Sequence, residues 1–173
     1  MTVELQLHID KILEHVKNPK DGLPADVFYL VSQLTPLINV ELLIKNKKGQ
    51  TLLTWRDDRF YGPAWHIPGG IIRFKEKIED RIEKVAHLEL GATVIFAPDP
   101  IHIRGLINTE RDIRGHFISM LYLCKFTTGP ACEKSYKGGD PQQGEWAWHD
   151  QAPENLLKVH ESFRKYIDET APL

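Results

Sequence analysis

A single glutamate lies where a predicted helix should be apolar. Residues 77–90 place apolar side chains at helical spacing, and Gly91 directly after them is a typical helix stop. At ~100° per residue, with Ile78 at zero, Ile82 falls at about 40° and Glu89 at about 20°, in the middle of the apolar stripe. A carboxylate that faces a buried surface is costly unless a cation or several donors satisfy it. Glu89 is therefore the first candidate for chemistry.

The chemistry that suits Glu89 is the binding of a divalent cation. The pair Gly69-Gly70 ahead of the helix predicts a turn whose backbone carbonyls are not obstructed by Cβ atoms. Hard cations such as Mg²⁺ take carbonyl and carboxylate oxygens together, keep several waters and also bind phosphate oxygens of a substrate. We therefore expect a Mg²⁺ site built from Gly70, Glu89 and an amide or carboxylate from elsewhere. The alternative is that Glu89, near the helix end, reaches solvent or pairs with an arginine.

The elements that must position these residues are helices and strands with clear stop signals. The periodicity of apolar residues and runs of β-branched residues predict them, and Gly or Pro residues mark their ends. Besides residues 77–90, helices are expected at 3–17, 25–34 and 154–169, and strands at 37–45, 50–55, 93–96, 101–107, 116–126 and 145–149. The strands 37–45 and 50–55 are predicted to form a hairpin across a polar turn. This order predicts an α/β (α+β) sandwich with a mixed sheet rather than a repeated βαβ array.

Length, charge and cysteine content limit the class of protein. The 173 residues suit one domain, with 42% hydrophobic residues, 27% charged residues and a net charge of −2. This balance gives no electrostatic reason to bind nucleic acid or an anionic membrane, and no apolar run is long enough to cross a bilayer. Cys124 and Cys132 cannot build a disulfide framework. We therefore expect a cytoplasmic domain with free thiols, and neither nucleic acid nor a membrane as partner.

The segment around Glu89 resembles the signature of the Nudix (MutT-like) hydrolase family. That signature is G-x5-E-x7-R-E-U-x-E-E-x-G-U, in which U is apolar. The positions that fit it are Gly70, Glu76, Ala86, Glu89, Gly91 and Ala92. Lys84 stands in the place of the arginine, and Val85 and Leu88 replace two glutamates that commonly bind metal. The box is therefore depleted.

The GDP-mannose mannosyl hydrolases, one branch of this family, show the same losses and are similar over roughly residues 35–165. The similar segments outside the box are Thr35-Pro36-Leu37, Leu52-Leu53-x-x-Arg56, Trp65-x-x-Pro68-Gly69-Gly70 and Gln142-Gln143-Gly144-Glu145-Trp146-Ala147-Trp148. In that branch a single Mg²⁺ is held by a glycine carbonyl, the last glutamate of the box and a glutamine in a late loop. The resemblance implies that Gly70, Glu89 and Gln142 hold Mg²⁺, with Mn²⁺ as an alternative, and that Glu89 serves catalysis.

Two residues of that branch's machinery are replaced here. The general base is a histidine after the late-loop glutamine, whereas this chain has Gln143, which cannot take a proton at neutral pH. The arginine that assists the departing diphosphate is replaced by Ile71. Arg73, two residues on, points to the same side of an extended segment, so we expect it to substitute. His116, at the start of a strand, is a candidate base or phosphate contact, although a lone strand histidine is more often structural.

The same resemblance places several arginines around the cleft. Arg56 and Arg59 precede the glycine pair, and their guanidinium groups match the oxygens of a diphosphate. Tyr61 is a candidate for stacking on a nucleotide base. The remaining arginines could equally be surface residues; these are Arg104, Arg111 and Arg114.

The resemblance implies a Nudix α/β/α sandwich over residues 35–173, preceded by an N-terminal helical extension, residues 1–34, that joins a homodimer. The implied activity is Mg²⁺-dependent hydrolysis of a nucleoside diphosphate derivative, with a nucleotide sugar such as GDP-mannose as the small-molecule substrate. Two alternatives stay open. One is a pyrophosphohydrolase of another nucleoside diphosphate compound, with Glu145 or His116 as base. The other is a degenerate domain that binds a nucleotide without catalysis.

Overall fold

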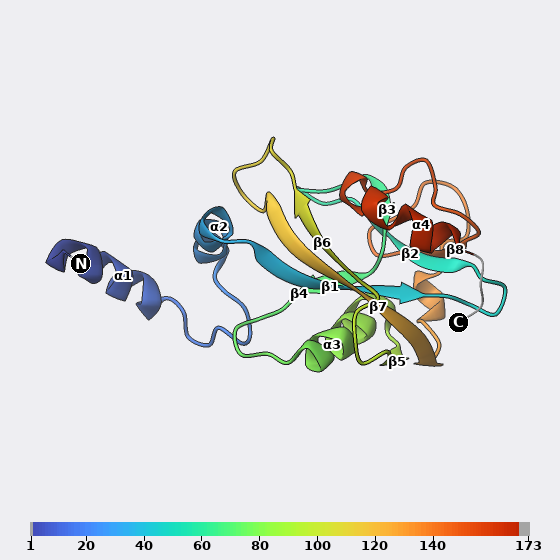
Figure 1. The fold of residues 1–173 in the computed structure, drawn as a ribbon, viewed down its shortest axis with the longest axis horizontal. Coiled ribbons are helices and arrows are strands. Elements are labelled where there is room, and N and C mark those ends of the chain that lie inside the picture. Colours follow the sequence, from blue (N-terminus) through green and yellow to red (C-terminus); the bar gives the residue numbers. More distant parts are fainter. Residues whose placement is uncertain (1, 170–173) are drawn as a thin grey trace.

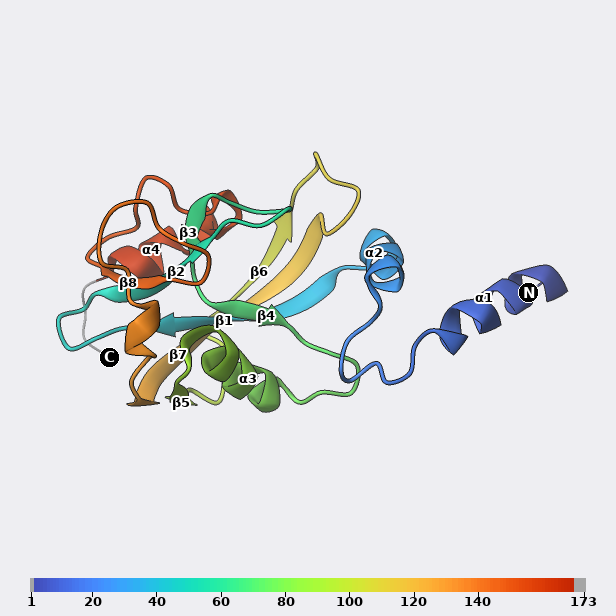
Figure 2. The same cartoon turned by 180° about the vertical axis from the view of Figure 1, so that it is seen from behind.

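The computed structural model describes residues 2–169 and consists of an N-terminal helical arm and a layered body (Figures 1 and 2). The predicted α/β (α+β) architecture with a mixed sheet is confirmed. The elements are α1 (Val3–Glu14), α2 (Ala25–Leu34), β1 (Leu37–Ile44), β2 (Thr51–Arg56), β3 (Ala64–His66), β4 (Gly69–Ile71), α3 (Ile78–Leu90), β5 (Thr93–Phe96), β6 (His102–Ile107), β7 (His116–Thr128), the 3-10 helix η1 (Cys132–Lys134), β8 (Trp146–His149), the 3-10 helix η2 (Lys158–Phe163) and α4 (Arg164–Asp168).

The strands form two sheets. The larger sheet has the order β4-β1-β7-β5, and β6 also pairs with β7; β1 and β7 run parallel and the other pairs antiparallel. The smaller sheet has the order β3-β2-β8. The predicted hairpin of strands 37–45 and 50–55 is wrong, because only Lys45 and Thr51 pair, in an isolated bridge. The free edge of β1 is taken by β4, with Val40 opposite Gly70, so β2 pairs with β3 and β8 instead.

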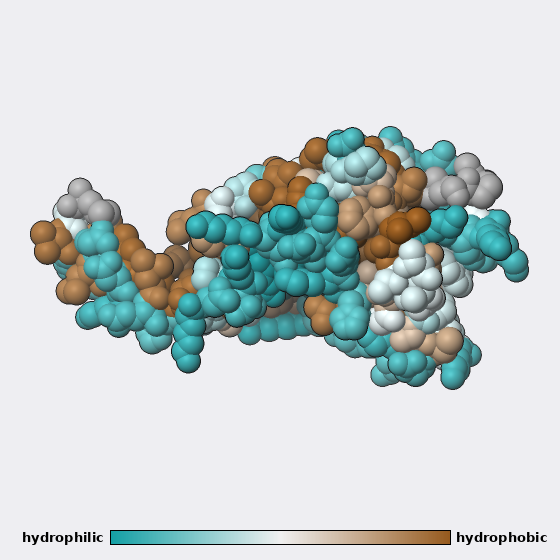
Figure 3. All heavy atoms as spheres, turned by 90° about the horizontal axis from the view of Figure 1, so that it is seen from below, coloured by the Kyte–Doolittle hydropathy of each residue, from teal (hydrophilic) through white to brown (hydrophobic). Residues whose placement is uncertain are grey.

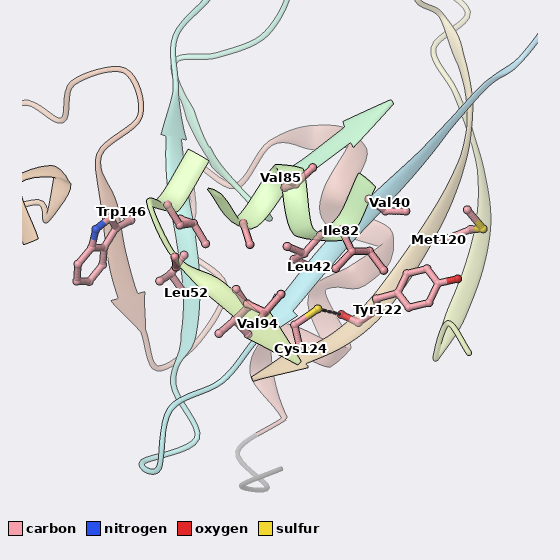
Figure 4. Packing of buried hydrophobic residues seen from close by; sticks show 14 residues of the cluster. Val40, Leu42, Leu52, Ile82, Val85, Val94, Met120, Tyr122, Cys124 and Trp146 are labelled. Atoms are coloured by element: carbon pink, nitrogen blue, oxygen red, sulfur yellow. Dashed lines mark hydrogen bonds between the residues drawn. The ribbon is translucent and has the colours of Figure 1, made fainter. Parts of the chain in front are cut away.

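Helices cover both faces of the larger sheet, with α3 on one side and η2 and α4 on the other (Figures 1 and 2). Alternate side chains of β1 point to the two faces of the sheet and pack into the two hydrophobic clusters. The cluster under α3 includes Val40, Leu42, Ile44, Ile82 and Val85 (Figure 4). The opposite cluster includes Leu43, Leu53, Leu121, Phe163 and Ile167. Full burial of each such side chain contributes about 1.5–3 kcal/mol.

Two further sequence predictions are corrected. The pair Gly69-Gly70 forms an extended edge strand, not a turn. The expected helix 154–169 is also wrong as a single element. The stretch before Lys158 hydrogen-bonds to β3: Trp65 N–H donates to the Asn155 carbonyl at 3.0 Å, and Leu157 N–H to the Trp65 carbonyl at 2.7 Å. These bonds pair Leu156 with Trp65 in an isolated bridge after a turn, and the helical structure begins only with η2.

The N-terminal helices differ in how they relate to the body. Helix α1 has no buried residue and extends away from it, with apolar side chains visible over it in Figure 3. Helix α2 packs against the body: the ring of Tyr29 lies 5.7 Å from that of Phe60, and Ser32 Oγ accepts a hydrogen bond from Arg114 N–H at 3.2 Å. Among residues 2–169, no helix is both long and apolar enough to cross a membrane.

Candidate active site

A pocket of about 460 Å³ lies where β1, β2, β4, the end of α3 and η2 meet. Of the residues selected from the sequence, Gly70, Glu89, Arg56 and Tyr61 line this pocket together. Two carboxylates, Glu89 and Glu41, lie near the glycine strand, and guanidinium groups line another part of the wall. The pocket thus combines acidic and cationic groups in one cleft.

The end of α3 that carries Glu89 is fixed by two sets of hydrogen bonds. Gly91 ends the helix in the left-handed conformation, φ 62°, and its N–H donates to the His87 carbonyl at 2.9 Å. Lys134 Nζ donates to the carbonyls of Leu88 and Glu89 at 3.2 and 3.1 Å. A cation at the helix C-terminus also balances the helix dipole. Glu89 is therefore presented to the pocket from a rigid turn.

Glu89 lies in an environment that disfavours its charge. Burial is the main cause that raises its pKa to about 8, and the charge of Glu41 adds to the shift. A backbone hydrogen bond from Gly69 and the charge of Arg56 oppose it. A divalent cation between the two carboxylates would remove this repulsion and stabilise both charges.

Glu41 is a site residue that the sequence reasoning missed. Its Oε1 accepts hydrogen bonds from Asn39 Nδ2 at 2.5 Å and Ser119 Oγ at 3.1 Å, and lies 3.4 Å from His160 Nε2. Its Oε2 lies against Gly69, where an added Cβ would collide with it and come within 2.8 Å of the Val40 carbonyl. One oxygen is thus anchored while the other faces the glycine strand of the pocket. The sequence does contain a signal for this residue: positions 39 and 41 are polar and lie on one face of an otherwise apolar strand.

Two buried histidines lie beside this site: His160 contacts the anchored oxygen of Glu41, and His66 contacts the Ile67 peptide group that holds His160. Ile67 N–H donates to His160 Nδ1 at 3.0 Å, so the proton of a neutral His160 ring is on Nε2, toward Glu41. His66 Nδ1 donates to the Ile67 carbonyl at 2.8 Å, and its Nε2 accepts from Thr54 Oγ1 at 2.9 Å. Burial lowers the pKa of His66 to about 3, which keeps that ring neutral. The network holds Glu41 in one orientation.

Gln142 and Arg73 are not among the residues that line the pocket. Gln142 Nε2 donates to the Asp140 carbonyl at 2.9 Å. The next residue, Gln143, lines the pocket and accepts a hydrogen bond from Asp57 N–H at 2.6 Å. Arg73 is exposed, and its guanidinium lies against Gly22 in the segment between α1 and α2.

Arg59 and His116 also lie outside the pocket lining. Arg59 is exposed and stacks on Phe60, 5.1 Å from the ring centre. His116 opens β7 opposite Ile107. Glu145, the other candidate base, accepts a hydrogen bond from Gln142 N–H at 2.8 Å through Oε2.

Glu76, the other acidic position of the box, holds the segment ahead of α3 in place. Its buried carboxylate pairs with Arg81 at 2.7 Å and Lys84 at 2.8 Å and accepts Arg73 N–H at 2.9 Å. Burial would raise its pKa, but the hydrogen bond from Lys84 and those from Arg73 and Arg81 together lower it to about 2. Lys84 thus takes part in the ion pair from the position where the signature has arginine.

We expect Glu76→Gln to lower the free energy of unfolding by about 2 kcal/mol at pH 7, because the variant keeps the volume and loses both ion pairs. The depressed pKa means that this contribution is present above the unfolded value near 4.5 and is lost as the pH falls through about 2. Urea unfolding at pH 7 and at pH 3 measures it. Equal stability of variant and wild type at pH 7 would refute the assignment.

The donor set fits a hard divalent cation. Two carboxylates, Glu41 and Glu89, lie near the glycine strand, and the missing Cβ of Gly69 lets the Glu41 carboxylate approach its backbone closely. No group of three His, Cys, Asp or Glu side chains gathers anywhere in residues 2–169, so a cation here would complete its shell with main-chain or amide oxygens and water. Mg²⁺ commonly binds in this way, through one or two carboxylates and substrate phosphates.

Comparison with known proteins places the fold. No protein-family model matches the chain. Low-salt glycan biosynthesis protein Agl8 of Haloferax volcanii is 32% identical over 76 residues, which span 44% of this chain and about half of that protein, 48%.

Several solved structures share the architecture at low sequence identity. One described as a possible asymmetric diadenosine tetraphosphate hydrolase from Jonesia denitrificans aligns with a TM-score of 0.60 and 16% identity over 81% of this chain and 99% of that one. A NUDIX family hydrolase from Clostridium perfringens aligns with a TM-score of 0.57 and 16% identity over 79% of this chain and 96% of that one. A UDP-X diphosphatase aligns with a TM-score of 0.57 and 15% identity over 96% of this chain and 78% of that one. Its match therefore extends into the N-terminal helices. The chain therefore has the fold of the Nudix hydrolases.

Proposed function

We propose that this chain is a Mg²⁺-dependent hydrolase of nucleoside diphosphate derivatives, of the Nudix type. The observation that carries the proposal is that the carboxylates of Glu41 and Glu89 lie near each other beside Gly70, in the same pocket as Arg56. Carboxylates that hold a cation and a guanidinium nearby are the groups that a diphosphate needs for binding and for stabilisation as a leaving group.

The proposed metal ligands are Glu89, Glu41 and the Gly70 carbonyl, and Gln142 remains a predicted ligand from the late loop. When bound, Mg²⁺ or Mn²⁺ would polarise phosphate oxygens and neutralise the charge that develops on the leaving diphosphate. The protein's own contribution is orientation: Asn39 and Ser119 fix Glu41, and Lys134 fixes the helix end that carries Glu89. Arg56 adds positive charge near the same phosphates.

The proposed substrate is a nucleotide sugar such as GDP-mannose. Two similar proteins support this class: the partial relative from Haloferax volcanii is a glycan biosynthesis protein, and one structural neighbour is a UDP-X diphosphatase. The ordinary pyrophosphohydrolase reaction and nucleotide binding without turnover are the competing outcomes. The two unpaired cysteines, Cys124 and Cys132, suit a reducing compartment, so we place the proposed activity in the cytoplasm.

The test is a screen of nucleoside diphosphate sugars with Mg²⁺ in ¹⁸O-water, with mass spectrometry of the products. Label in the sugar means attack at carbon. Label in phosphate means cleavage at phosphorus. Absence of turnover, together with a thermal shift on addition of nucleotide, would overturn the catalytic proposal and leave a binding domain.

We also propose that α1 joins two copies of the chain in a homodimer. Its apolar residues include Leu5 and Leu13, which are 51% and 58% exposed. An apolar helix face of this kind is usually covered by a partner. Light scattering should show a dimer for the wild type and a monomer for Leu5→Glu combined with Leu13→Glu, with an unchanged thermal midpoint of the body. A monomeric wild type would refute the dimer.

A further inference from the structure

A second pocket lies away from the candidate active site, where the end of β1, β5 and the second half of β7 meet (Figure 1). Its volume is about 370 Å³, a size typical of small-molecule sites. Lys45, which directly follows β1, is four residues from Glu41, about 13 Å along an extended chain. No residue lines both pockets. The residues that line the second pocket are Lys45, Asn46, Lys47, Ile95, Phe96, Ala97, Leu123, Cys124 and Lys125.

One wall of this second pocket is apolar and reaches solvent. Ile95 of β5 is 58% exposed, and it pairs with Lys125 of β7. Phe96 and Leu123 are half-buried beside it. Ala97 continues the wall, because its N–H donates to the Leu123 carbonyl at 3.0 Å. Water in a concave apolar site of this kind is displaced favourably by an apolar ligand.

The other wall is cationic. Strands β1 and β7 run parallel with Ile44 beside Cys124, so Lys45 and Lys125 hold the next position in each chain and lie on the same face of the sheet. Lys47 extends from the turn after β1 and, like Lys125, is exposed. Within residues 2–169, none of the three lysines forms an ion pair and no carboxylate lines the pocket. The second pocket therefore carries uncompensated positive charge.

Lys45 is fixed in place, and its contacts do not neutralise its charge. Its Nζ donates to neutral oxygens, among them Thr51 Oγ1 at 2.8 Å and the Ile167 carbonyl at 3.1 Å. Burial lowers the pKa of Lys45, and the charges of Glu169 and Asp168 oppose this shift only in part. An anion held in the pocket would stabilise the charged form of this lysine.

We propose that the second pocket binds a free amphipathic carboxylate, that is, a small molecule with an apolar body and one carboxylate group. The apolar body lies against Ile95 and Leu123. The carboxylate meets the ammonium groups of Lys47 and Lys125. A single carboxylate suits lysines, which act as point charges, and the described lining contains no arginine to hold a phosphate in a planar fork. The site shares no residue with the proposed hydrolase centre and does not depend on its activity.

The test uses octanoate as the probe, with octanol as its uncharged counterpart and acetate as the same head group without a chain. Each is titrated into the full chain and followed by ¹H–¹⁵N correlation spectra. We expect amide shifts at Ile95, Ala97 and Leu123. We also expect octanoate to bind about tenfold more tightly than octanol or acetate, because only octanoate uses both walls.

Two variants examine the two walls separately, each with a matched control. Lys125→Gln should weaken octanoate about two- to fivefold and leave octanol unchanged, and Lys48→Gln removes an exposed lysine outside the lining. Ile95→Glu should abolish binding of both ligands. Its control is Ile103→Glu, at an isoleucine of β6 that is 57% exposed. Both controls should bind octanoate as the wild type does.

Several results would overturn the proposal. Equal affinities for octanoate and octanol would deny the lysines a role, and octanoate binding that survives Ile95→Glu would place the ligand elsewhere. Sedimentation with phosphatidylglycerol-phosphatidylcholine vesicles, without binding of free octanoate, would assign this surface to a membrane instead. If the thermal midpoint shows that Ile95→Glu is unfolded, Lys47→Gln combined with Lys125→Gln replaces it. An octanoate affinity equal to that of the wild type would then refute the site.

Discussion

Replacing Glu89 with glutamine is expected to stabilise the metal-free protein and to abolish its stabilisation by Mg²⁺ or Mn²⁺. Burial and the neighbouring Glu41 raise the pKa of Glu89 to about 8, above its unfolded value near 4.5. The folded state therefore binds more protons than the unfolded state between these values, and the free energy of unfolding falls as the pH rises through that window. At pH 8 the neutral variant should be more stable by about 1–3 kcal/mol.

The measurement is the thermal midpoint of both proteins between pH 5 and pH 8, with and without millimolar Mn²⁺. The wild type should lose stability toward pH 8 without metal and regain it with metal. A cation that binds the carboxylates of the folded state displaces the proton and stabilises the fold. Glu89→Gln should show a flatter pH profile and no response to metal. Hydrolysis should fall by about two orders of magnitude.

The matched control for Glu89→Gln is Glu83→Gln, which makes the same charge change on the exposed face of α3. It should keep the pH profile and the metal response of the wild type. A metal-dependent rise in the thermal midpoint that persists in Glu89→Gln would remove Glu89 from the metal site. A metal response lost in both variants would point to net charge rather than to a specific ligand.

Local patterns made Glu89 and most elements predictable from the sequence. The position of Glu89 follows from helical periodicity within one segment, and Gly91 marks the end of that segment. Bounds such as 25–34 and 93–96 follow from local breakers and β-branched runs in the same way. These features depend on neighbours in the sequence, which a single chain displays directly.

Features that depend on tertiary contacts could not be predicted in this way. The hairpin failed because β4, from a distant segment, occupies the edge of β1. Whether Gln142 or Gln143 faces the pocket depends on a one-residue register in an irregular loop, where no periodicity constrains the side chains. Arg73 lies two residues beyond β4 at the start of a turn, and its guanidinium meets Gly22, which approaches from the N-terminal segment. Glu41 is hidden in an apolar strand, and its role emerges only when Ser119 and His160 are beside it.

Replacing Glu41 is expected to separate two roles of this carboxylate, anchoring and metal binding. Glu41→Ala leaves Asn39 Nδ2, Ser119 Oγ and His160 Nε2 without their buried acceptor, so unfolding should become easier by about 2–4 kcal/mol. Glu41→Gln keeps the acceptor at Oε1 and places its amide nitrogen at the Oε2 position that faces Gly69. An amide nitrogen does not bind a hard cation.

The glutamine variant is therefore the sharper test of the metal site. Its thermal midpoint without metal should stay near that of the wild type, while its affinity for Mn²⁺, measured by calorimetry or by the paramagnetic resonance of free Mn²⁺, should fall by about 10- to 100-fold. Glu83→Gln again serves as the charge-matched control. Unchanged Mn²⁺ affinity in Glu41→Gln, together with a destabilised Glu41→Ala, would restrict Glu41 to a structural role. Glu89, the one box glutamate that lines the pocket, would then hold the cation with carbonyl and amide oxygens.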